Sequence, residues 1–194
     1  MIITIARQSG CGGLMIGEQL ALHYGIPLFT RERLSQMAQE RGQLEALTNF
    51  FDETPADALM LAIGGENDSH ITEPTRLLVS NLVGQDSCVI VGRCGNFIFR
   101  DRPDLVSVFL KGNEQSRISF LANQKGISLA EAQENVRLKD EQRRSYHLYY
   151  TGQVWGDAQN YDLCIDSSRL GVQRTAQLIA DYADALSILP PSAL

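Results

Sequence analysis

Long hydrophobic runs are absent from this chain. No stretch approaches the ~18–20 consecutive apolar residues of a membrane-spanning helix. The apolar residues 1–5 are too few, and wrongly flanked, for a signal peptide. We therefore expect no membrane partner and a cytoplasmic location.

Cysteine and histidine are scarce, with four cysteines and three histidines. The cysteines show no zinc-like spacing and the histidines are scattered, so neither type predicts a metal site. No Ser-His-Asp or Cys-His arrangement is supported by spacing. We expect the cysteines to be reduced, with Cys88 and Cys164 acting as small hydrophobes in apolar runs.

Positive charge is in the minority. Seventeen Lys and Arg face 23 Asp and Glu, giving a net charge of −6, so the whole-chain field does not attract nucleic acid. Any anion site must come from local arginines and backbone amides. The length of 194 residues and the hydrophobic fraction of 44% are typical of one globular domain.

The N-terminal stretch is the most informative feature that is present. An apolar run of β type stops at a glycine-dense turn, Ser9-Gly10-Cys11-Gly12-Gly13, and an amphipathic segment follows. Strand, glycine loop and helix form the layout of a phosphate-binding loop, in which backbone N–H groups and the helix N-terminus attract an anion. The alternative is a generic strand–helix turn.

Cys11 lies within this glycine loop. A nearby helix N-terminus can lower the pKa of a thiol. The other interpretation is a small residue in a crowded turn, which we favour.

Strand-like and helical segments alternate along the chain. Residues 2–6, 26–29, 87–92, 105–110 and 161–166 resemble strands; residues 14–23, 31–41, 73–83, 114–124 and 172–186 resemble helices. Ser128 opens another helix with the spacing of a capping box. Residues 45–47 and 57–63 have helical character, and residues 64–69 resemble a turn-rich loop. The alternation predicts an α/β domain with a mainly parallel sheet, whose ligands bind outside the carboxyl ends of the strands.

Two further groups of residues are candidates for chemistry. Arg93 follows a buried strand, where a guanidinium can clamp a phosphate or simply form a surface salt bridge. Arg137, Asp140, Arg143 and Arg144 form a charged cluster that is either a solvated stripe on a helix or a lid over transferring phosphates. The aromatic-rich residues 146–157 favour a packed corner over a surface for stacking a base.

In combination, these motifs make the chain resemble the cytidylate kinase-like family, a branch of the P-loop nucleoside monophosphate kinases. The resemblance rests on residues 3–13, 22–29, 88–94, 140–144, 149–157 and 161–168, and covers nearly the whole chain. It implies a P-loop NTPase-type parallel sheet flanked by helices, in a single kinase-like domain spanning residues 1–194. The core would comprise residues 1–30, 84–125 and 160–194, with a helical monophosphate-binding insertion at about 31–83 and a lid at about 126–158.

The resemblance also implies roles for particular residues. The loop from Ser9 to Gly13, with Arg7 before it, would hold the donor phosphates. Arg93 would hold the acceptor phosphate, and Arg76 is a looser match to a second acceptor contact. Asp140 and Arg143 match the lid, with Arg137 and Arg144 beside them. The expected ligands are ATP with Mg²⁺ and a nucleoside monophosphate similar to CMP.

The chain departs from the family pattern at several positions. Gly13 stands where the loop lysine is usual, and Met15 where a threonine is usual. The branch often has Arg-Glu where this chain has Leu14-Met15. Cys94 replaces an aspartate, and Val136 replaces a lid arginine. Loss of one charge at the transferring group costs ~10²–10³ in rate, unless Arg7, Arg143 or Arg144 substitutes for it.

The leading hypothesis is ATP-dependent phosphoryl transfer to a nucleoside monophosphate, with CMP as the first candidate. One alternative is a nucleotide-binding regulatory protein that has lost catalysis, since the loop lysine is missing. Another is a P-loop kinase of a different small substrate.

Overall fold

Five parallel strands form the centre of the molecule. The computed structural model describes residues 1–51, 73–84 and 86–188, so the expected helical stretch at 57–63 and loop at 64–69 lie outside the described residues. The strands are β1 (Ile2–Arg7), β2 (Leu28–Phe29), β3 (Cys88–Val91), β4 (Leu105–Lys111) and β5 (Leu163–Asp166). Their order across the sheet is β2-β3-β1-β4-β5, with every neighbouring pair parallel.

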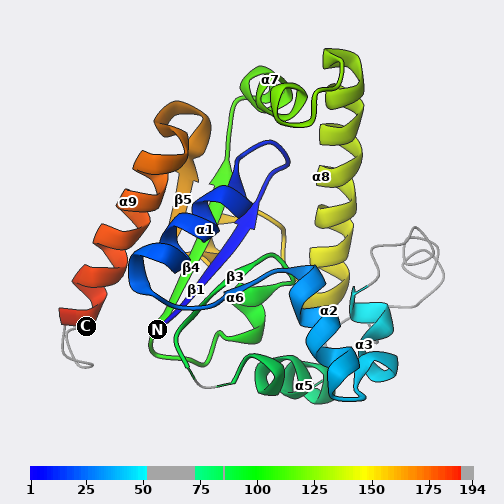
Figure 1. Cartoon of the computed structure of the whole chain (residues 1–194), viewed down its shortest axis with the longest axis vertical. Helices are drawn as coiled ribbons and strands as arrows, with labels where there is room; N and C mark the ends of the chain where they lie inside the picture. The colour runs from blue at the N-terminus through cyan, green and yellow to red at the C-terminus, as the bar shows by residue number, and fades with distance from the viewer. Residues whose placement is uncertain (52–72, 85, 189–194) are drawn as a thin grey trace.

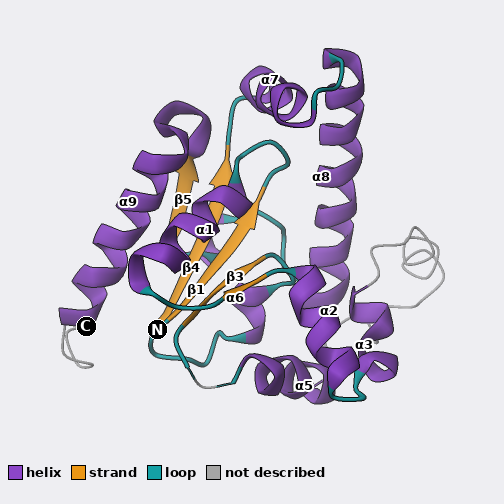
Figure 2. Ribbon diagram, in the orientation of Figure 1, coloured by secondary structure: helices purple, strands orange, loops and turns teal. Residues whose placement is uncertain are grey.

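Helices surround the sheet (Figures 1 and 2). They are α1 (Gly13–Tyr24), α2 (Arg31–Glu40), α3 (Leu44–Phe51), α5 (Glu73–Val83), α6 (Gly95–Ile98), α7 (Glu114–Lys125), α8 (Leu129–Thr151) and α9 (Ser167–Ile188), with a 3-10 turn at Ala158–Asn160. The expected α/β fold with a parallel sheet flanked by helices is therefore confirmed.

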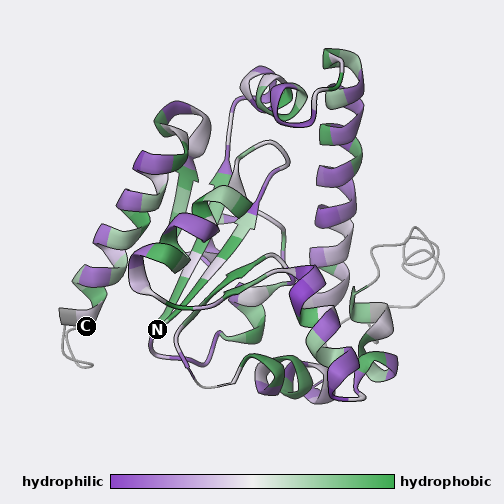
Figure 3. Cartoon of the chain, viewed as in Figure 1, coloured by the Kyte–Doolittle hydropathy of each residue, from purple (hydrophilic) through white to green (hydrophobic). Residues whose placement is uncertain are grey.

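The two faces of the sheet bury separate cores because side chains alternate along each strand. Ile3 and Ile5 of β1 pack with α1 and α9, where Leu20 and Ile179 are buried. Ile2 faces the opposite core, which includes residues of α2, α3, α5 and α6. The continuous apolar runs of the central strands are thus explained by burial on both faces, and the strands are among the most hydrophobic segments in Figure 3.

Helices α7 and α8 form an arm at the carboxyl end of the sheet (Figure 1). A small core of its own holds the arm together, with Ile118 and Leu121 of α7 against Ala132 and Val136 of α8. Helix α8 begins with the expected capping box between Ser128 and Glu131. Most of its length is hydrophilic (Figure 3).

The predicted last helix begins after Gly171 (φ 74°), whose non-helical backbone kinks the chain; α9 also includes a helical turn that starts at Ser167, before this kink. One expectation near the C-terminus needs correction. Cys164 is exposed rather than a core hydrophobe, because β5 is an edge strand and its buried side chain is the next one, Ile165. Within the described residues, no helix has the length and apolar character to cross a membrane.

Helix α9 offers a matched test of the packing. Ile179 is fully buried and its neighbour Leu178 is 43% exposed. We expect Ile179→Ala to lower the free energy of unfolding by about 2–5 kcal/mol, because it leaves a cavity between α9 and the sheet. Leu178→Ala should change it by less than about 0.5 kcal/mol. Urea denaturation measures both, and equal effects would contradict this placement of α9.

Candidate active site

The glycine loop connects the end of β1 to the start of α1. Gly10 (φ 81°) and Gly12 (φ 69°) adopt left-handed backbone conformations that favour glycine. A Cβ at Gly10 would also collide with the backbone carbonyl of Arg117. Gly12 is the N-cap of α1, so the loop leads directly into a helix N-terminus, as expected for an anion-binding loop.

A buried ion pair ties the arm to this loop. Asp140 of α8 accepts a hydrogen bond from the Ser9 N–H (2.6 Å) and pairs with Nη1 of Arg117 from α7 (2.6 Å). The same Nη1 donates to the Ser9 carbonyl (3.0 Å). Both charged residues are buried. In this conformation Asp140 therefore fixes the loop to the arm, and its carboxylate already binds one backbone N–H of the loop.

A cavity of about 210 Å³ opens over the glycine loop. Its walls come from the loop, from α7 and from α8. Lys125, Lys139 and Arg143 bring positive charge to it, and Phe120 and Leu121 bring apolar surface. This combination suits a ligand with an anionic end and an aromatic end.

A second cavity, of about 280 Å³, adjoins the first. The two share four wall residues, which are Arg7, Leu14, Lys139 and Arg143. The second cavity has five cationic side chains in its walls and one carboxylate, that of Glu32; the cations are Arg7, Arg31, Arg93, Lys139 and Arg143. In a chain whose net charge is −6, this concentration predicts a polyanionic ligand.

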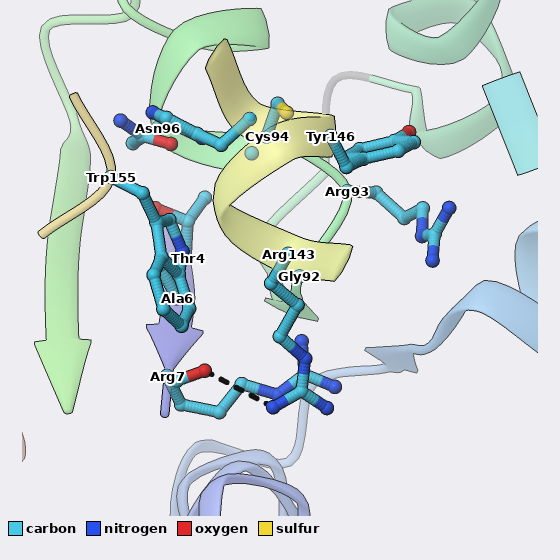
Figure 4. A pocket seen from close by; sticks show the side chains of 12 residues that line it. Thr4, Ala6, Arg7, Gly92, Arg93, Cys94, Asn96, Arg143, Tyr146 and Trp155 are labelled. Atoms are coloured by element: carbon cyan, nitrogen blue, oxygen red, sulfur yellow. Dashed lines mark hydrogen bonds between the residues drawn. The ribbon is translucent and has the colours of Figure 1, made fainter. Parts of the chain in front are cut away.

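Arg7 and Arg143 lie where the cavities meet. Arg143 Nη1 donates to the Arg7 backbone carbonyl (3.2 Å), a bond that Figure 4 marks with a dashed line. Both residues also line a small chamber of about 30 Å³ between β1, β3, α6 and α8. They come from segments 136 residues apart in the chain, and the fold brings them to one point.

Arg93 follows β3 at the same edge of the sheet, with φ 56°. It lines the cation-rich cavity, but in Figure 4 its side chain points away from Arg7 and Arg143. Nη1 of Arg93 donates to the carbonyls of Phe50 (3.1 Å) and Phe51 (3.4 Å) at the C-terminal end of α3, and the guanidinium lies over the Tyr146 ring. It therefore links the cation-rich cavity to α3.

Three of the arginines that the sequence analysis named as candidates lie outside the walls of these cavities. Arg137 is 58% exposed and pairs with Glu134 (2.7 Å) and Glu141 (3.4 Å), as in a solvated stripe. Arg144 is exposed on α8. Arg76 pairs with Glu73 (2.7 Å) and Asp101 (3.3 Å). The charged cluster on α8 thus divides, with only part of it facing the site.

Local environments shift the titration of two groups at the site. Burial raises the pKa of the Cys11 thiol to about 11, so the helix N-terminus does not activate it. This bears out the interpretation of Cys11 as a small residue in a crowded turn. A hydrogen bond from its own backbone N–H, together with Thr30, Arg31 and Arg93, lowers the pKa of Glu32, which stays ionised at neutral pH.

The aromatic-rich segment forms a packed corner, as expected. Trp155 makes an edge contact with Phe109 (5.2 Å between ring centroids), and Phe109 packs against Tyr161 (5.2 Å). Tyr146 and Tyr150 of α8 pack on Phe50 of α3 (6.0 and 5.4 Å). These contacts join the end of α8 to the sheet and to α3.

Comparison with known proteins agrees with this geometry. A family model described as the cytidylate kinase-like family matches residues 2–169. This chain belongs to the cytidylate kinase-like family. The expectation from the sequence motifs is thereby confirmed.

Curated relatives carry a consistent name. The chain is 25% identical to a cytidylate kinase of Methanopyrus kandleri, over 96% of this chain and 94% of the relative. It is 26% identical to a cytidylate kinase of Pyrococcus abyssi, over 96% and 95%, respectively. These matches support a function like that of a nucleoside monophosphate kinase.

Solved structures share the fold. An uncharacterized protein from Eubacterium ventriosum superposes with a TM-score of 0.74 at 25% identity, covering 95% of this chain and 98% of that one. A gluconokinase from Sinorhizobium meliloti (15% identity, 95% and 94% coverage) and a shikimate kinase from Bacteroides thetaiotaomicron (12%, 95% and 98%) each give 0.51. The last two show the P-loop kinase fold alone.

Two departures from the cytidylate kinase-like pattern have packing explanations. Val136, where an arginine is usual, is buried in the core of the α7–α8 arm. Cys94, where an aspartate is usual, is buried at the N-cap of α6 with φ 52°. Neither position faces solvent, so a charge at either would be costly.

Motif comparison missed two charged residues of the site. Lys139 lines both adjoining cavities. Its spacing of four residues from Arg143 places the two on one helix face, and this spacing is a signal that the sequence contains. Arg117 anchors Asp140, but it sits in an ordinary amphipathic helix 23 residues earlier, where nothing in the sequence marks it.

The role of Asp140 can be tested by removing its charge. Asp140→Asn keeps an oxygen for the Ser9 N–H but leaves Arg117 buried without its counter-ion, which costs about 3–5 kcal/mol of unfolding free energy. The exposed pair partner Glu134 on the same helix is the control, and Glu134→Gln should cause no measurable change. Loss of activity by Asp140→Asn with unchanged thermal stability would contradict the structural role.

His147 predicts an acid-sensitive fold. Burial lowers the pKa of its imidazole from 6.5 to about 4. Between these pH values, His147 binds a proton in the unfolded chain but stays neutral in the folded chain. The free energy of unfolding therefore falls by on the order of 3 kcal/mol as the pH drops from about 6.5 to about 4. Urea denaturation across this range should show a smaller loss in His147→Gln than in the parent. His23 is exposed, so His23→Gln is the control variant. Equal slopes in the parent, His147→Gln and His23→Gln would contradict the assignment of the acid sensitivity to His147.

Proposed function

We propose that this chain transfers the γ-phosphoryl group of ATP to a nucleoside monophosphate, with CMP as the preferred acceptor. The names of the curated relatives support the class of acceptor. The family match over residues 2–169 supports the phosphoryl-transfer chemistry.

The observation that carries the proposal is the shared wall of the two adjoining cavities, the one over the glycine loop and the cation-rich one. Phosphoryl transfer requires donor and acceptor in line, with positive charge where the transferring oxygens pass. Arg7, Lys139 and Arg143 occupy that boundary. One cavity lies over an anion-binding loop and the other contains Arg93, so each side has its own phosphate-binding groups.

The roles follow from position. The loop from Ser9 to Gly13 and the N-terminus of α1 hold the donor phosphates, with the adenine beside Phe120. Arg93 and Arg31 bind the acceptor phosphate. Arg143, on the arm, stabilises the charge that develops during transfer. Residues 31–83 would be the monophosphate-binding insertion and residues 126–158 the lid.

Magnesium enters this scheme as part of the MgATP substrate. The loop offers Gly13, Leu14 and Met15 where a metal-binding hydroxyl is usual in such loops. No cluster of three or more His, Cys, Asp or Glu in the described part of the chain suits a metal ion. Protein ligands for a resident Mg²⁺ are therefore not evident, and the phosphates and water would hold the ion.

A coupled assay with MgATP against a panel of nucleoside monophosphates tests the proposal. We expect turnover of one acceptor, CMP first. Arg93→Lys should lower kcat/KM by about 10²-fold, because an ammonium cannot replace bidentate guanidinium contacts. Arg174→Ala, an exposed change on α9, should leave turnover unchanged.

Absence of turnover with every acceptor, in protein that still binds ATP by calorimetry, would contradict the kinase assignment. It would favour the alternative of a nucleotide-binding protein without catalysis. Turnover that persists unchanged in Arg93→Lys would indicate a contaminating kinase.

A further inference from the structure

The Arg7 side chain crosses the place that a side chain at position 13 would use. A Cβ built on Gly13 lies 2.8 Å from Cγ of Arg7 and 3.3 Å from its Cβ and Cδ. These are atoms of the stem, near the backbone of β1, and they cannot swing aside as a flexible tip can. Gly13 has ordinary helical geometry at the first position of α1. A side chain at position 13 is therefore excluded by the stem of Arg7, and not by the backbone conformation of residue 13.

The other end of Arg7 reaches β3. A Cβ at Gly92 would collide with Nη1 of Arg7, and Cζ of Arg7 lies 3.4 Å from that point. The side chain thus runs from the first turn of α1, on the donor side, to the residue before Arg93, on the acceptor side. Two glycines, one on each side, leave room for it.

Arg143 brings a second positive charge close to Arg7. Arg7 and Arg143 are the two residues common to the walls of the two adjoining cavities and the small chamber, and Arg143 donates a hydrogen bond to the Arg7 carbonyl. Two cationic side chains in the same cavity walls favour an anion at this place. The transferring phosphoryl group is such an anion.

We propose that Arg7 performs the task of the absent loop lysine, bridging the outer donor phosphates and the acceptor phosphate from the end of β1 instead of from the start of α1. This inference rests on the proposed function, whose site it completes. The residues at positions 7 and 13 are then alternatives, because the cavity wall has room for a long side chain at only one of them.

The mutual exclusion makes the proposal testable with a double-mutant cycle. The variants are Arg7→Ala, Gly13→Lys and the combined Arg7→Ala/Gly13→Lys. Arg7→Gln keeps the stem against Gly13 and removes the charge. Arg174→Ala is the matched arginine control on the exposed side of α9. Circular dichroism and thermal melting confirm that each variant is folded.

We expect Arg7→Ala and Arg7→Gln each to lower kcat by about 10²–10³-fold, with a smaller change in the KM for the acceptor. Gly13→Lys alone should also lower activity, because its side chain displaces Arg7. The combined variant should recover at least about tenfold of the activity lost in Arg7→Ala, the non-additivity expected of two residues that compete for one place.

Calorimetric titration with ATP and with ADP separates this proposal from the proposed function. Arg7→Ala should weaken ATP binding more than ADP binding, and the combined variant should restore the difference. If the parent turns over no acceptor but shows this pattern, Arg7 keeps its assignment and the kinase proposal fails.

Two results would overturn the assignment of Arg7. The first is an effect of less than about threefold on kcat and on ATP affinity in both Arg7→Ala and Arg7→Gln. The second is an effect of Gly13→Lys that is the same whether residue 7 is arginine or alanine, because the two positions would then be independent.

Discussion

The buried contact between Asp140, Arg117 and the Ser9 backbone determines how the site is assembled. It joins helices α7 and α8 to the glycine loop, at 2.6 Å on both sides of the carboxylate. Lys139 and Arg143 lie on the helix that this contact holds, so their place in the cavity walls depends on it. An uncompensated buried charge on either partner would be costly, which favours a single arrangement of arm and loop.

Local charge at the site opposes the charge of the whole molecule. The chain carries a net charge of −6, yet one cavity of about 280 Å³ has five cations in its walls and one carboxylate. Parallel strands make this concentration possible, because the ends of β1 and β3 meet at one edge and bring Arg7 and Arg93 together from distant parts of the sequence. Helix α8 of the arm adds Lys139 and Arg143 to the same walls. The site therefore attracts a polyanion without a basic protein surface.

Much of the fold could be predicted from the sequence because its signals are local. The apolar runs at β3 and β4, the capping box at Ser128 and the glycine after α1 each specify an element by themselves. The exposure of Cys164 could not be predicted, because it depends on which strand lies at the edge of the sheet.

For the site, the family motifs identified Arg93 and Arg143, and the structure places both in the cation-rich cavity. The charged cluster alone did not separate Arg143 from Arg137 and Arg144, because all three lie on one helix and only its packing decides which of them faces the loop. Arg117 and the spacing of Arg7 against Gly13 are tertiary features with no local signal. The sequence named Arg7, Arg143 and Arg144 as candidate substitutes for the loop lysine, and the contact with Gly13 is what distinguishes Arg7 from the other two.

A site that binds donor and acceptor together should also bind one molecule that joins them. A bisubstrate analogue, adenosine and cytidine joined by a polyphosphate, can be titrated into the protein by calorimetry. We expect an affinity well above those of ATP and CMP measured separately, because one molecule fills both cavities and places its phosphates between Arg7 and Arg143. An affinity no higher than that of ATP alone would contradict it.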